Sequence, residues 1–403
     1  MNILFLTIFG INDVNERGLY NDLMRTFKEH GHSVYIACPT ERRYNKNTYL
    51  KNEDDIDILR VKTLNFQKTN IIEKGLSTIL LEHQFYAAIK KYFRGIKFDL
   101  ILYSTPPITF TKVVKYIKKK DGALSYLLLK DIFPQNAVDL GMLKRNGLLH
   151  KYFIRKEKDL YAISDRIGCM SPANVQFVIK HNKTIDPDIV ELNPNSIIPI
   201  ENRISNLEKL TIRKKYNLPL SVPIFIYGGN LGKPQGIEFL LAVLSDNRDR
   251  NDLFFLIVGS GTEFDKLKKW FDDYSPKNSL LLNGIPKADY DLILQASDVG
   301  LIFLDKRFTI PNFPSRLLSY LECEMPVIAA TDINSDVGCI AEENEFGLWC
   351  ESGDLEKFKQ HINKFISSPQ LLQTMGKKGD YFLKTNYTSE KSYEIIMKHL
   401  LHV

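Results

Sequence analysis

Short apolar runs and amphipathic stretches alternate along the whole chain, which is the pattern of parallel sheets with crossover helices. Residues 2–9 are predicted to form the first strand, and residues 18–29 a helix whose apolar positions recur at helical spacing. That helix ends at His30-Gly31-His32, and residues 33–38 form the second predicted strand. Residues 41–57 are polar and charged, so we expect them to form a surface loop.

The same rhythm continues through the first half, with a predicted helix at residues 77–92 and strands at 98–103 and 124–129. A shift toward proline and asparagine at residues 189–206 marks a domain boundary. After it the alternation restarts, through elements expected at residues 224–227, 236–244, 254–258, 262–271, 279–282, 289–295, 299–303 and 326–330.

Two α/β units in tandem predict an α/β fold of two facing Rossmann-like domains with a deep interdomain cleft. We assign residues 1–203 to the first domain and residues 204–385 to the second. Residues 386–403 contain a last helix, at about residues 389–401, that no strand follows.

Composition places the chain among soluble globular proteins, with 44% hydrophobic and 25% charged residues in 403. The opening residues 1–7 read as a strand rather than a signal peptide, and no run of about 18 apolar residues could cross a bilayer. The five cysteines form no CxxC pair, and no zinc-type spacing occurs. We therefore expect a cytoplasmic protein without a metal site.

Charge is distributed unevenly between the two halves. Residues 1–205 hold nine more basic than acidic side chains, whereas the remainder holds three more acidic than basic ones. A basic half suggests an anionic partner, either nucleic acid or a membrane leaflet, or it is simply a solvated basic surface. No helix-turn-helix, zinc-finger or RNP-type motif is present, which argues against nucleic acid.

The strongest local signal is the stretch at residues 224–236, in which an apolar strand runs through Gly228-Gly229-Asn230-Leu231-Gly232-Lys233-Pro234-Gln235-Gly236 into a helix. Glycines let the backbone approach a ligand, and a helix N-terminus adds positive potential, which together suit a diphosphate. Lys233 adds a full charge. The alternative is a tight turn that binds nothing. The spacing matches neither the P-loop nor the dinucleotide fingerprint.

Two more loops in this half follow or precede strands. Residues 257–262 contain a lone Gly-x-Gly, for which simple turn chemistry is the better interpretation. In residues 313–321, Ser315 and Arg316 open a helix and are placed to hold phosphate oxygens through an N–H group and a guanidinium fork. The alternative is an ordinary serine cap beside a solvated arginine.

In the first half, candidate residues lie at the ends of strands, where open α/β sheets bind ligands. They occur in Asn15-Glu16-Arg17-Gly18, Ser104-Thr105-Pro106-Pro107 and Lys130-Asp131-Ile132-Phe133-Pro134. A carboxylate there accepts a proton or orients a hydroxyl. Alternatively, Glu16 is a solvated charge and Asp131 caps a turn. The Asp-x-Asp pairs at residues 55–57, 186–188 and 289–291 are interpreted as surface acids rather than metal ligands.

Taken in order, these motifs resemble family 4 glycosyltransferases. The donor-domain resemblance is carried by residues 229–236, Asn283-Gly284-Ile285-Pro286-Lys287, residues 296–301, Pro314-Ser315-Arg316 and residues 320–329. Residues 104–107, 131–134 and 137–141 are similar to a narrower branch. That branch assembles capsule and O-antigen repeat units and includes N-acetyl-L-fucosamine transferases.

The resemblance implies a GT-B fold in which residues 1–203 bind the acceptor, residues 204–385 bind the nucleotide sugar, and the helix in residues 386–403 returns to the first domain. It implies a UDP-sugar donor and transfer with retention of configuration, without a metal or cofactor. It also implies a polyprenyl-pyrophosphate-linked sugar as acceptor, which accounts for a basic first domain lying peripherally at the inner face of the membrane. The site residues that it implies are, for catalysis, Asp131, Glu16, Lys233 and Arg316; for the donor, Gly229, Asn230, Gly232, Gln235, Gly259, Asn283, Ile285, Ser315, Ser319 and Glu322; and for the acceptor, Arg17, Gly18, Ser104, Thr105 and Lys130.

The sequence departs from the family pattern at two places. The phosphate loop carries Asn230 and Gln235 where members usually have Arg and Lys, so Lys233 and Arg316 are the candidates to supply that charge. The family's two glutamates, eight positions apart, correspond to Pro311 and Ser319, with Glu322 three residues later. Two alternatives to an active retaining enzyme therefore stay open: a catalytically silent nucleotide-sugar-binding subunit, and an inverting GT-B transferase or epimerase.

Overall fold

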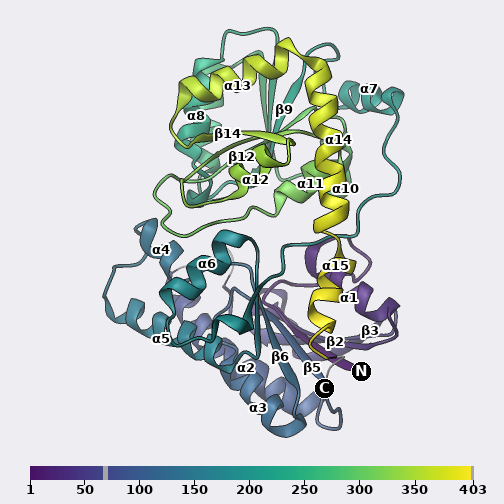
Figure 1. The fold of residues 1–403 in the computed structure, drawn as a ribbon, viewed down its shortest axis with the longest axis vertical. Helices are drawn as coiled ribbons and strands as arrows, with labels where there is room; N and C mark the ends of the chain where they lie inside the picture. Colours follow the sequence, from purple (N-terminus) through teal and green to yellow (C-terminus); the bar gives the residue numbers. More distant parts are fainter. Residues whose placement is uncertain (67–70, 401–403) are drawn as a thin grey trace. The chain divides into compact units, whose positions relative to one another are not determined.

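The computed structural model describes residues 1–66 and 71–400 and divides the chain into two compact units. The first unit consists of Met1–Ile198 together with Thr388–Val403, and the second of Pro199–Tyr387. Each unit is built on its own parallel sheet flanked by helices (Figure 1). The sequence-based boundaries, 203/204 and 385/386, lie a few residues from these divisions.

The first unit holds an eight-stranded sheet in the order β3-β4-β2-β1-β5-β6-β7-β8, all of it parallel except the β3–β4 pair. Its strands are β1 Asn2–Leu6, β2 Ser33–Glu41, β3 Tyr49–Glu53, β4 Ile56–Thr63, β5 Leu100–Ser104, β6 Leu124–Leu129, β7 Arg166–Cys169 and β8 Val190–Leu192. Its α-helices are α1 Leu19–Glu29, α2 Ile71–Tyr92, α3 Thr111–Asp121, α4 Gln135–Asp139, α5 Leu148–Ile163, α6 Pro172–His181 and α15 Ser389–Met397.

The prediction of a surface loop at residues 41–57 is wrong, because this stretch contains the short 3₁₀ helix Arg42–Tyr44 and the edge strand β3. In β3 no residue is fully buried, and Lys51 and Glu53 pair with each other on one side of the strand. A charged edge strand of this kind carries no apolar alternation to reveal it. Asp57 lies in β4 and accepts a hydrogen bond from Asn52, so it belongs to the β3–β4 pair rather than to a loop.

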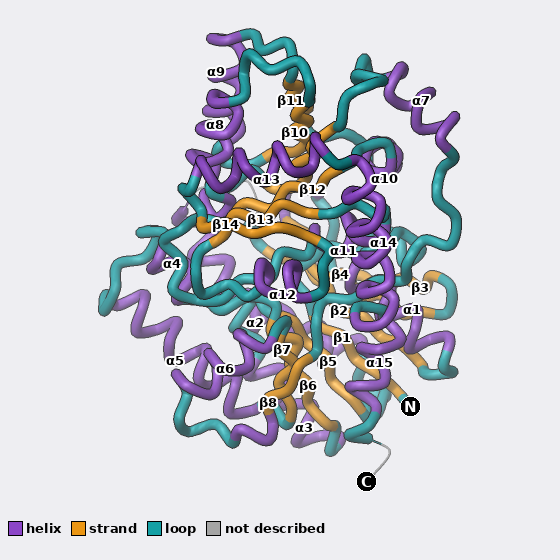
Figure 2. Tube along the Cα trace, turned by 45° about the horizontal axis from the view of Figure 1, so that its top comes forward, coloured by secondary structure: helices purple, strands orange, loops and turns teal. Residues whose placement is uncertain are grey.

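The second unit holds a six-stranded parallel sheet in the order β11-β10-β9-β12-β13-β14 (Figure 2). Its strands are β9 Ile224–Asn230, β10 Phe254–Ser260, β11 Ser279–Asn283, β12 Val299–Phe303, β13 Val327–Thr331 and β14 Gly347–Glu351. Its α-helices are α7 Asn206–Lys215, α8 Ile237–Asp246, α9 Phe264–Tyr274, α10 Lys287–Gln295, α11 Arg316–Glu322, α12 Val337–Glu343, α13 Leu355–Ser367 and α14 Pro369–Asn386.

Each unit has its own apolar core. In the second, side chains of β9, β10, β12 and β13 pack with those of α8 and α13. In the first, α1 and α15 cover one face of the sheet and share a core with β1, β2 and β5. Within the described residues, no helix is long and apolar enough to cross a membrane.

The chain's last described helix, α15, is fixed to the first unit by polar as well as apolar contacts. Ser392 donates a hydrogen bond of 2.7 Å to Asn193, and Thr26 of α1 donates one of 2.8 Å to Ser389. The aromatic ring of Tyr393 meets that of Phe27 edge to face at 5.0 Å. The segment therefore completes the first unit although it follows the second unit in sequence.

We predict that Ile396→Ala, which empties a fully buried position in α15, lowers the free energy of unfolding of the first unit by about 3 kcal/mol. Both tryptophans, Trp270 and Trp349, lie in the second unit. Tryptophan fluorescence therefore follows the second unit alone, whereas circular dichroism follows both during urea unfolding. The exposed control Glu394→Ala should leave both transitions within about 0.5 kcal/mol. An equal shift in both signals for Ile396→Ala would contradict the assignment of α15 to the first core.

Candidate functional site

Three loops that are far apart in sequence come together at the carboxyl end of the second sheet. The parallel register pairs Gly229 of β9 with Gly259 of β10, and Gly259 with Asn283 of β11. The N–H of Gly284 also donates to the carbonyl of Gly259. Carboxyl ends of strands in open parallel sheets are where ligands bind, so the structure gathers these predicted donor residues on one edge.

Glycine is required at this edge for close packing between the loops. A Cβ on Gly259 would lie 1.9 Å from the carbonyl oxygen of Gly229, and one on Gly261 would lie 2.3 Å from that of Leu231. Gly229 itself has a φ of 123°, which side-chain-bearing residues rarely adopt. The Gly-x-Gly interpreted as simple turn chemistry thus holds the glycine loop after β9 in position.

Strands β9 and β12 separate at this edge. They pair only at Phe225 with Val299 and Ile226 with Gly300, after which each continues without the other. The hydroxyl of Tyr320 lies between them, accepting from the N–H of Gly228 at 3.2 Å and donating to the carbonyl of Leu301 at 3.1 Å. From β9 the next strand, β10, lies on one side, whereas the later strand β12 lies on the other side, so the strand order reverses at β9. The gap between β9 and β12 is therefore the topological switch point of the sheet.

Arg316 lies one helical turn before Tyr320 on α11, so both side chains leave the same face of the helix. Its guanidinium is stacked 4.3 Å above the ring of Tyr227, and its Nη2 donates to Oε1 of Gln235 at 2.6 Å. Its Nη1 is buried and has no hydrogen-bond partner among the described residues. A buried charged donor without an acceptor is costly, and an anion at this position would satisfy it.

The loop between β9 and α8 presents a second cation. Lys233 is exposed and forms no ion pair with any described residue. Asn230 is exposed as well, while its carbonyl accepts from the hydroxyl of Tyr227 at 2.8 Å. Gly236 ends the loop in the left-handed conformation, where a Cβ would meet the carbonyl of Leu304 at 2.8 Å. The neighbouring Gly232, also a predicted donor residue, is buried.

The remaining predicted donor residues divide by burial. Ser315, Ser319 and Glu322 are spaced to share one face of α11, and along it Ser315 is exposed, Ser319 half-buried and Glu322 only 5% exposed. Ser315 makes no side-chain cap, and the main-chain carbonyl of Glu322 accepts from Arg203. Ile285 is half-buried and directly follows Gly284, which has a φ of 40°.

Sequence reasoning missed the three tyrosines that shape this region, Tyr227, Tyr290 and Tyr320. A Cβ on Gly300 would lie 2.4 Å from the ring of Tyr320, and one on Gly228 would lie 2.0 Å from the hydroxyl of Tyr290. Burial raises the pKa of Tyr320 to about 12, so its hydroxyl stays protonated. Glycines inside predicted strands were the available signal, because they mark places where another group approaches the backbone.

In the first unit, one hydroxyl joins two predicted acceptor segments. Oγ1 of Thr105 accepts from the N–H groups of Lys130 at 3.0 Å and Asp131 at 3.1 Å. Its neighbour Ser104 is fully buried and faces the phenol of Tyr20 on α1, whose pKa burial raises to about 12 while the Ser104 hydroxyl acts in the opposite direction. The ends of β5 and β6 are therefore held together, as parallel neighbours predict.

Asp131 is a carboxylate with an unusual environment. Burial raises its pKa to about 6, although hydrogen bonds from Asn136 and the N–H of Ile132 lower it. The amide of Asn136 donates to both carboxylate oxygens, at 2.8 and 2.9 Å, from the first turn of α4. The group is thus fixed in orientation and changes its charge close to neutral pH.

Lys130 is directed toward the protein rather than toward a ligand. Its Nζ donates to the main-chain carbonyls of Asn193 and Pro194, both at 3.1 Å. Burial lowers its pKa to about 7. The structure therefore gives this predicted acceptor residue a role in holding the loop after β6 against the chain that follows β8.

The segment at residues 15–18 is organised by a residue that sequence reasoning missed. Asp22 is fully buried, and its two oxygens accept from the N–H groups of Gly18 at 3.0 Å and Ile198 at 2.8 Å. Arg17 donates to the carbonyl of Ile198, whereas Glu16 is exposed. An acid in the first turn of a helix that begins after glycine was the available signal.

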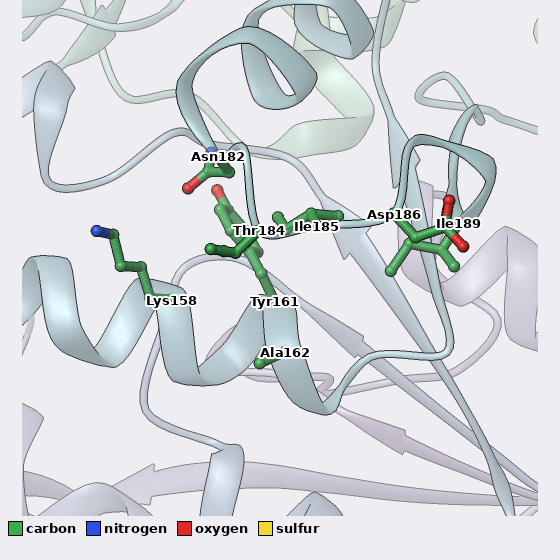
Figure 3. Close-up of a pocket in the computed structure, with 8 residues that line it drawn as sticks. All are labelled: Lys158, Tyr161, Ala162, Asn182, Thr184, Ile185, Asp186 and Ile189. Atoms are coloured by element: carbon green, nitrogen blue, oxygen red, sulfur yellow. The ribbon is translucent and has the colours of Figure 1, made fainter.

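A separate cavity of about 260 Å³ lies between α5 and the chain after α6 (Figure 3). Figure 3 shows Lys158 and Asp186 at opposite ends of it, with the ring of Tyr161 between them. No predicted site residue lines it. Among the side chains that the structure describes, no group of three or more His, Cys, Asp or Glu is arranged to hold a metal ion.

Known proteins are similar to this chain in sequence. Residues 208–381, within the second unit, match the family model of the glycosyl transferases group 1. WbjE of Pseudomonas aeruginosa, named as a probable glycosyltransferase, is 22% identical over 333 residues, which cover 81% of this chain and 80% of that protein. WcaI of Escherichia coli K12, named for colanic acid biosynthesis, is 25% identical over 259 residues, or 62% and 61% of the two chains.

A solved structure shows the same fold over the whole chain. HepE of Anabaena, determined in complex with UDP-glucose, superposes with a TM-score of 0.71 at 14% identity and covers 100% of both chains. The two Rossmann-like sheets found here are those of the GT-B architecture. The expected fold class is therefore confirmed: the chain has the GT-B fold, and residues 208–381 of its second unit match the glycosyl transferases group 1 family.

Proposed function

We propose that the chain is a retaining transferase that moves a sugar from a UDP-sugar to a polyprenyl-pyrophosphate-linked sugar during capsule or O-antigen assembly. An N-acetylated deoxyhexose such as N-acetyl-L-fucosamine is the sugar that the branch resemblance favours. The observation that carries the proposal is the buried, unpaired Nη1 of Arg316 beside the glycine loop at the switch point. The UDP-glucose bound by HepE and the colanic acid assignment of WcaI support it.

In this proposal the donor diphosphate lies at the carboxyl end of β9. Arg316 contributes a guanidinium whose orientation the ring of Tyr227 and the amide oxygen of Gln235 fix. Lys233 contributes a mobile second charge from the exposed loop. When the bond between the sugar and the diphosphate breaks, negative charge grows on the leaving oxygen, and these cations stabilise it. Because the guanidinium is already held in place, little reorganisation accompanies the reaction.

The acceptor side of the proposal depends on Asp131. As a carboxylate it accepts a hydrogen bond from the acceptor hydroxyl and orients the oxygen toward the sugar carbon. Asn136 and the N–H groups that bond Thr105 fix its position, whereas Glu16 is exposed and lacks comparable support. We therefore favour Asp131 over Glu16 for this role. Hydrogen bonds of Arg17, Gly18, Thr105 and Lys130 hold the surrounding loops, and Ser104 lies buried beside Thr105 at the end of β5.

A lipid-linked acceptor requires the protein to work at a membrane surface. We propose a cytoplasmic protein that contacts the anionic inner leaflet peripherally through its basic first unit, where residues 1–205 hold nine more basic than acidic side chains. The proposal includes neither nucleic acid nor a cofactor among its partners.

The second candidate is a silent subunit that binds a nucleotide sugar but does not transfer it. The observation that favours it is Ser319, half-buried on the α11 face where family members carry a glutamate. Measurable UDP binding without turnover of any donor would support this candidate over the enzyme. An inverting enzyme would be recognised by the anomeric configuration of its product.

The first experiment tests transfer itself. We expect purified protein, given UDP- and GDP-sugars with a lipid-pyrophosphate-linked sugar acceptor, to transfer one UDP-sugar at a rate that EDTA does not reduce. The readout is radiolabelled sugar in the lipid fraction, and nuclear magnetic resonance of the product reports its anomeric configuration. Loss of transfer in EDTA that added magnesium restores would contradict the metal-independent mechanism.

A second prediction concerns charge at the diphosphate. Arg316→Ala combined with Lys233→Ala should lower kcat by about 10²–10³-fold, the usual loss when donors to a developing anion are removed. The variant Arg316→Lys keeps the positive charge, but an ammonium group cannot stack on the tyrosine ring or form the same hydrogen bonds as a guanidinium. With Lys233 unchanged, its kcat should lie between that of the double alanine variant and that of wild type.

The matched control is Arg248→Ala with Lys269→Ala, because Arg248 also stacks on a tyrosine, 5.2 Å from the ring of Tyr274, but lies away from the glycine loop. This control should keep the wild-type kcat. An unchanged rate in the Arg316 and Lys233 variant would remove both residues from the mechanism.

A third prediction concerns pH. Because the proposed role needs the Asp131 carboxylate, and burial raises its pKa to about 6, activity should rise with pH through about 6 and level off above it. Below that point kcat/KM should fall about tenfold per pH unit. Asp131→Asn should lose most of the activity, and its remaining activity should no longer fall with pH below about 6. The exposed control Asp159→Asn should keep both the activity and this pH dependence. A limb that persists unchanged in Asp131→Asn would assign the titration to another group.

A further inference from the structure

A cluster of exposed apolar side chains lies at the connection between α4 and α5 in the first unit. Leu148 is 88% exposed, and Leu149 and Met142 are each 60% exposed. Single exposed apolar residues are common on soluble proteins, but three of them between residues 142 and 149, where the connection enters α5, are not expected without a partner. We call residues 141–155 the α5 tip; Figures 1 and 2 both place it at the edge of the unit, beyond the end of the sheet.

Hydrogen bonds hold the α5 tip in a defined conformation. The N–H groups of Met142 and Leu143 both donate to the carbonyl of Ala137, at 2.8 and 3.0 Å, and the N–H of Gly147 donates to that of Lys144. The N–H of Asn146 donates to the ring of His150, which is buried beneath the first turn of α5. The leucines are therefore held outward by a hydrogen-bonded turn.

Unpaired cations surround these apolar side chains. Lys144, Arg145, Lys151 and Arg155 are all exposed, and none forms an ion pair within the part of the chain that the structure describes. Leu148, Lys151 and Arg155 are spaced three and four residues apart, so they share one face of α5. Glu157, by contrast, is buried on the other side of the helix, where it accepts from Tyr161.

We propose that the α5 tip is the surface by which this protein docks on an anionic lipid bilayer. Apolar side chains that enter the headgroup boundary, together with cations that meet anionic lipids, are the two signals that make peripheral binding stable. A second copy of the chain fits less well, because a twofold contact would bring the same unpaired cations face to face. The nearest acid on the exposed face of α5, Asp159, lies a turn beyond Arg155.

The tip is continuous with the proposed acceptor loop. The ring of Phe133, two residues after Asp131, meets that of Phe153 on α5 edge to face at 4.9 Å. The α4 helix that carries Asn136 leads directly into the tip. This inference rests on the proposed lipid-linked acceptor and deepens it, since docking at the tip brings the Asp131 loop to the surface that carries the acceptor.

Vesicle co-sedimentation tests the proposal with the full chain and no sugar substrate. Wild type should sediment with vesicles of phosphatidylcholine and phosphatidylglycerol, and remain in solution with phosphatidylcholine alone. Leu148→Glu with Leu149→Glu should lower partitioning onto anionic vesicles by about tenfold or more. The change removes the apolar side chains that enter the bilayer and adds negative charges that the anionic lipids repel. Lys144→Glu with Lys151→Glu should do the same without changing the leucines.

The control is Ile333→Glu in the second unit, whose side chain is 73% exposed. No lysine or arginine occurs between residues 327 and 344, so the anionic-lipid signal is missing there and partitioning should stay at the wild-type level. Circular dichroism confirms that each variant is folded.

Three outcomes would overturn the proposal: wild type that ignores anionic vesicles, folded tip variants of both kinds that bind them as wild type does, or a dimer in sedimentation velocity that the leucine variant dissolves. The vesicles contain neither donor nor acceptor. A failure of wild type to bind therefore contradicts the proposed membrane contact and its docking surface but not the transfer reaction, whereas a failure of transfer contradicts the reaction but not the docking surface.

Discussion

The hydroxyl of Tyr320 is the contact on which the second unit's site depends. It replaces the hydrogen bonds that β9 and β12 would otherwise make with each other, by joining the N–H of Gly228 to the carbonyl of Leu301. Its ring fits only because residue 300 is glycine. Tyr320 also fixes α11, which places Arg316, one turn earlier, with its guanidinium stacked on the ring of Tyr227 in β9.

That arrangement leaves a cost in the folded protein. The buried Nη1 of Arg316 has no acceptor among the described residues, and an unsatisfied buried donor costs about 1–3 kcal/mol. Stacking on Tyr227 and the bond to Gln235 offset part of that cost. Asp131 in the first unit is a comparable case, since its raised pKa means that burial disfavours its charged form. Both groups are costly in the fold; in the proposed reaction Arg316 would meet an anion and Asp131 a hydroxyl.

The sequence predicted the alternation of strands and helices and the two-sheet α/β fold, because both follow from local periodicity. Turn chemistry singled out the loops at residues 229–236 and 314–316, whereas the loop at residues 283–287 was indicated only by the family resemblance. It did not predict β3, whose polar edge position gives no apolar pattern. Nor did it predict Tyr227, Tyr320 or Asp22, because their partners lie far away in sequence. For Lys130 the sequence predicted the position but not the contacts. Its place at a strand end was predicted, whereas only the structure shows that its ammonium donates to two main-chain carbonyls.

The most direct test of this account is a crystal structure of the protein with UDP bound. We expect a diphosphate oxygen within hydrogen-bonding distance of Nη1 of Arg316, beside the glycine loop at residues 229–236, with the stack on Tyr227 retained. A diphosphate bound elsewhere, with Nη1 of Arg316 still lacking an acceptor, would contradict the central claim that the switch point between β9 and β12 is the donor site.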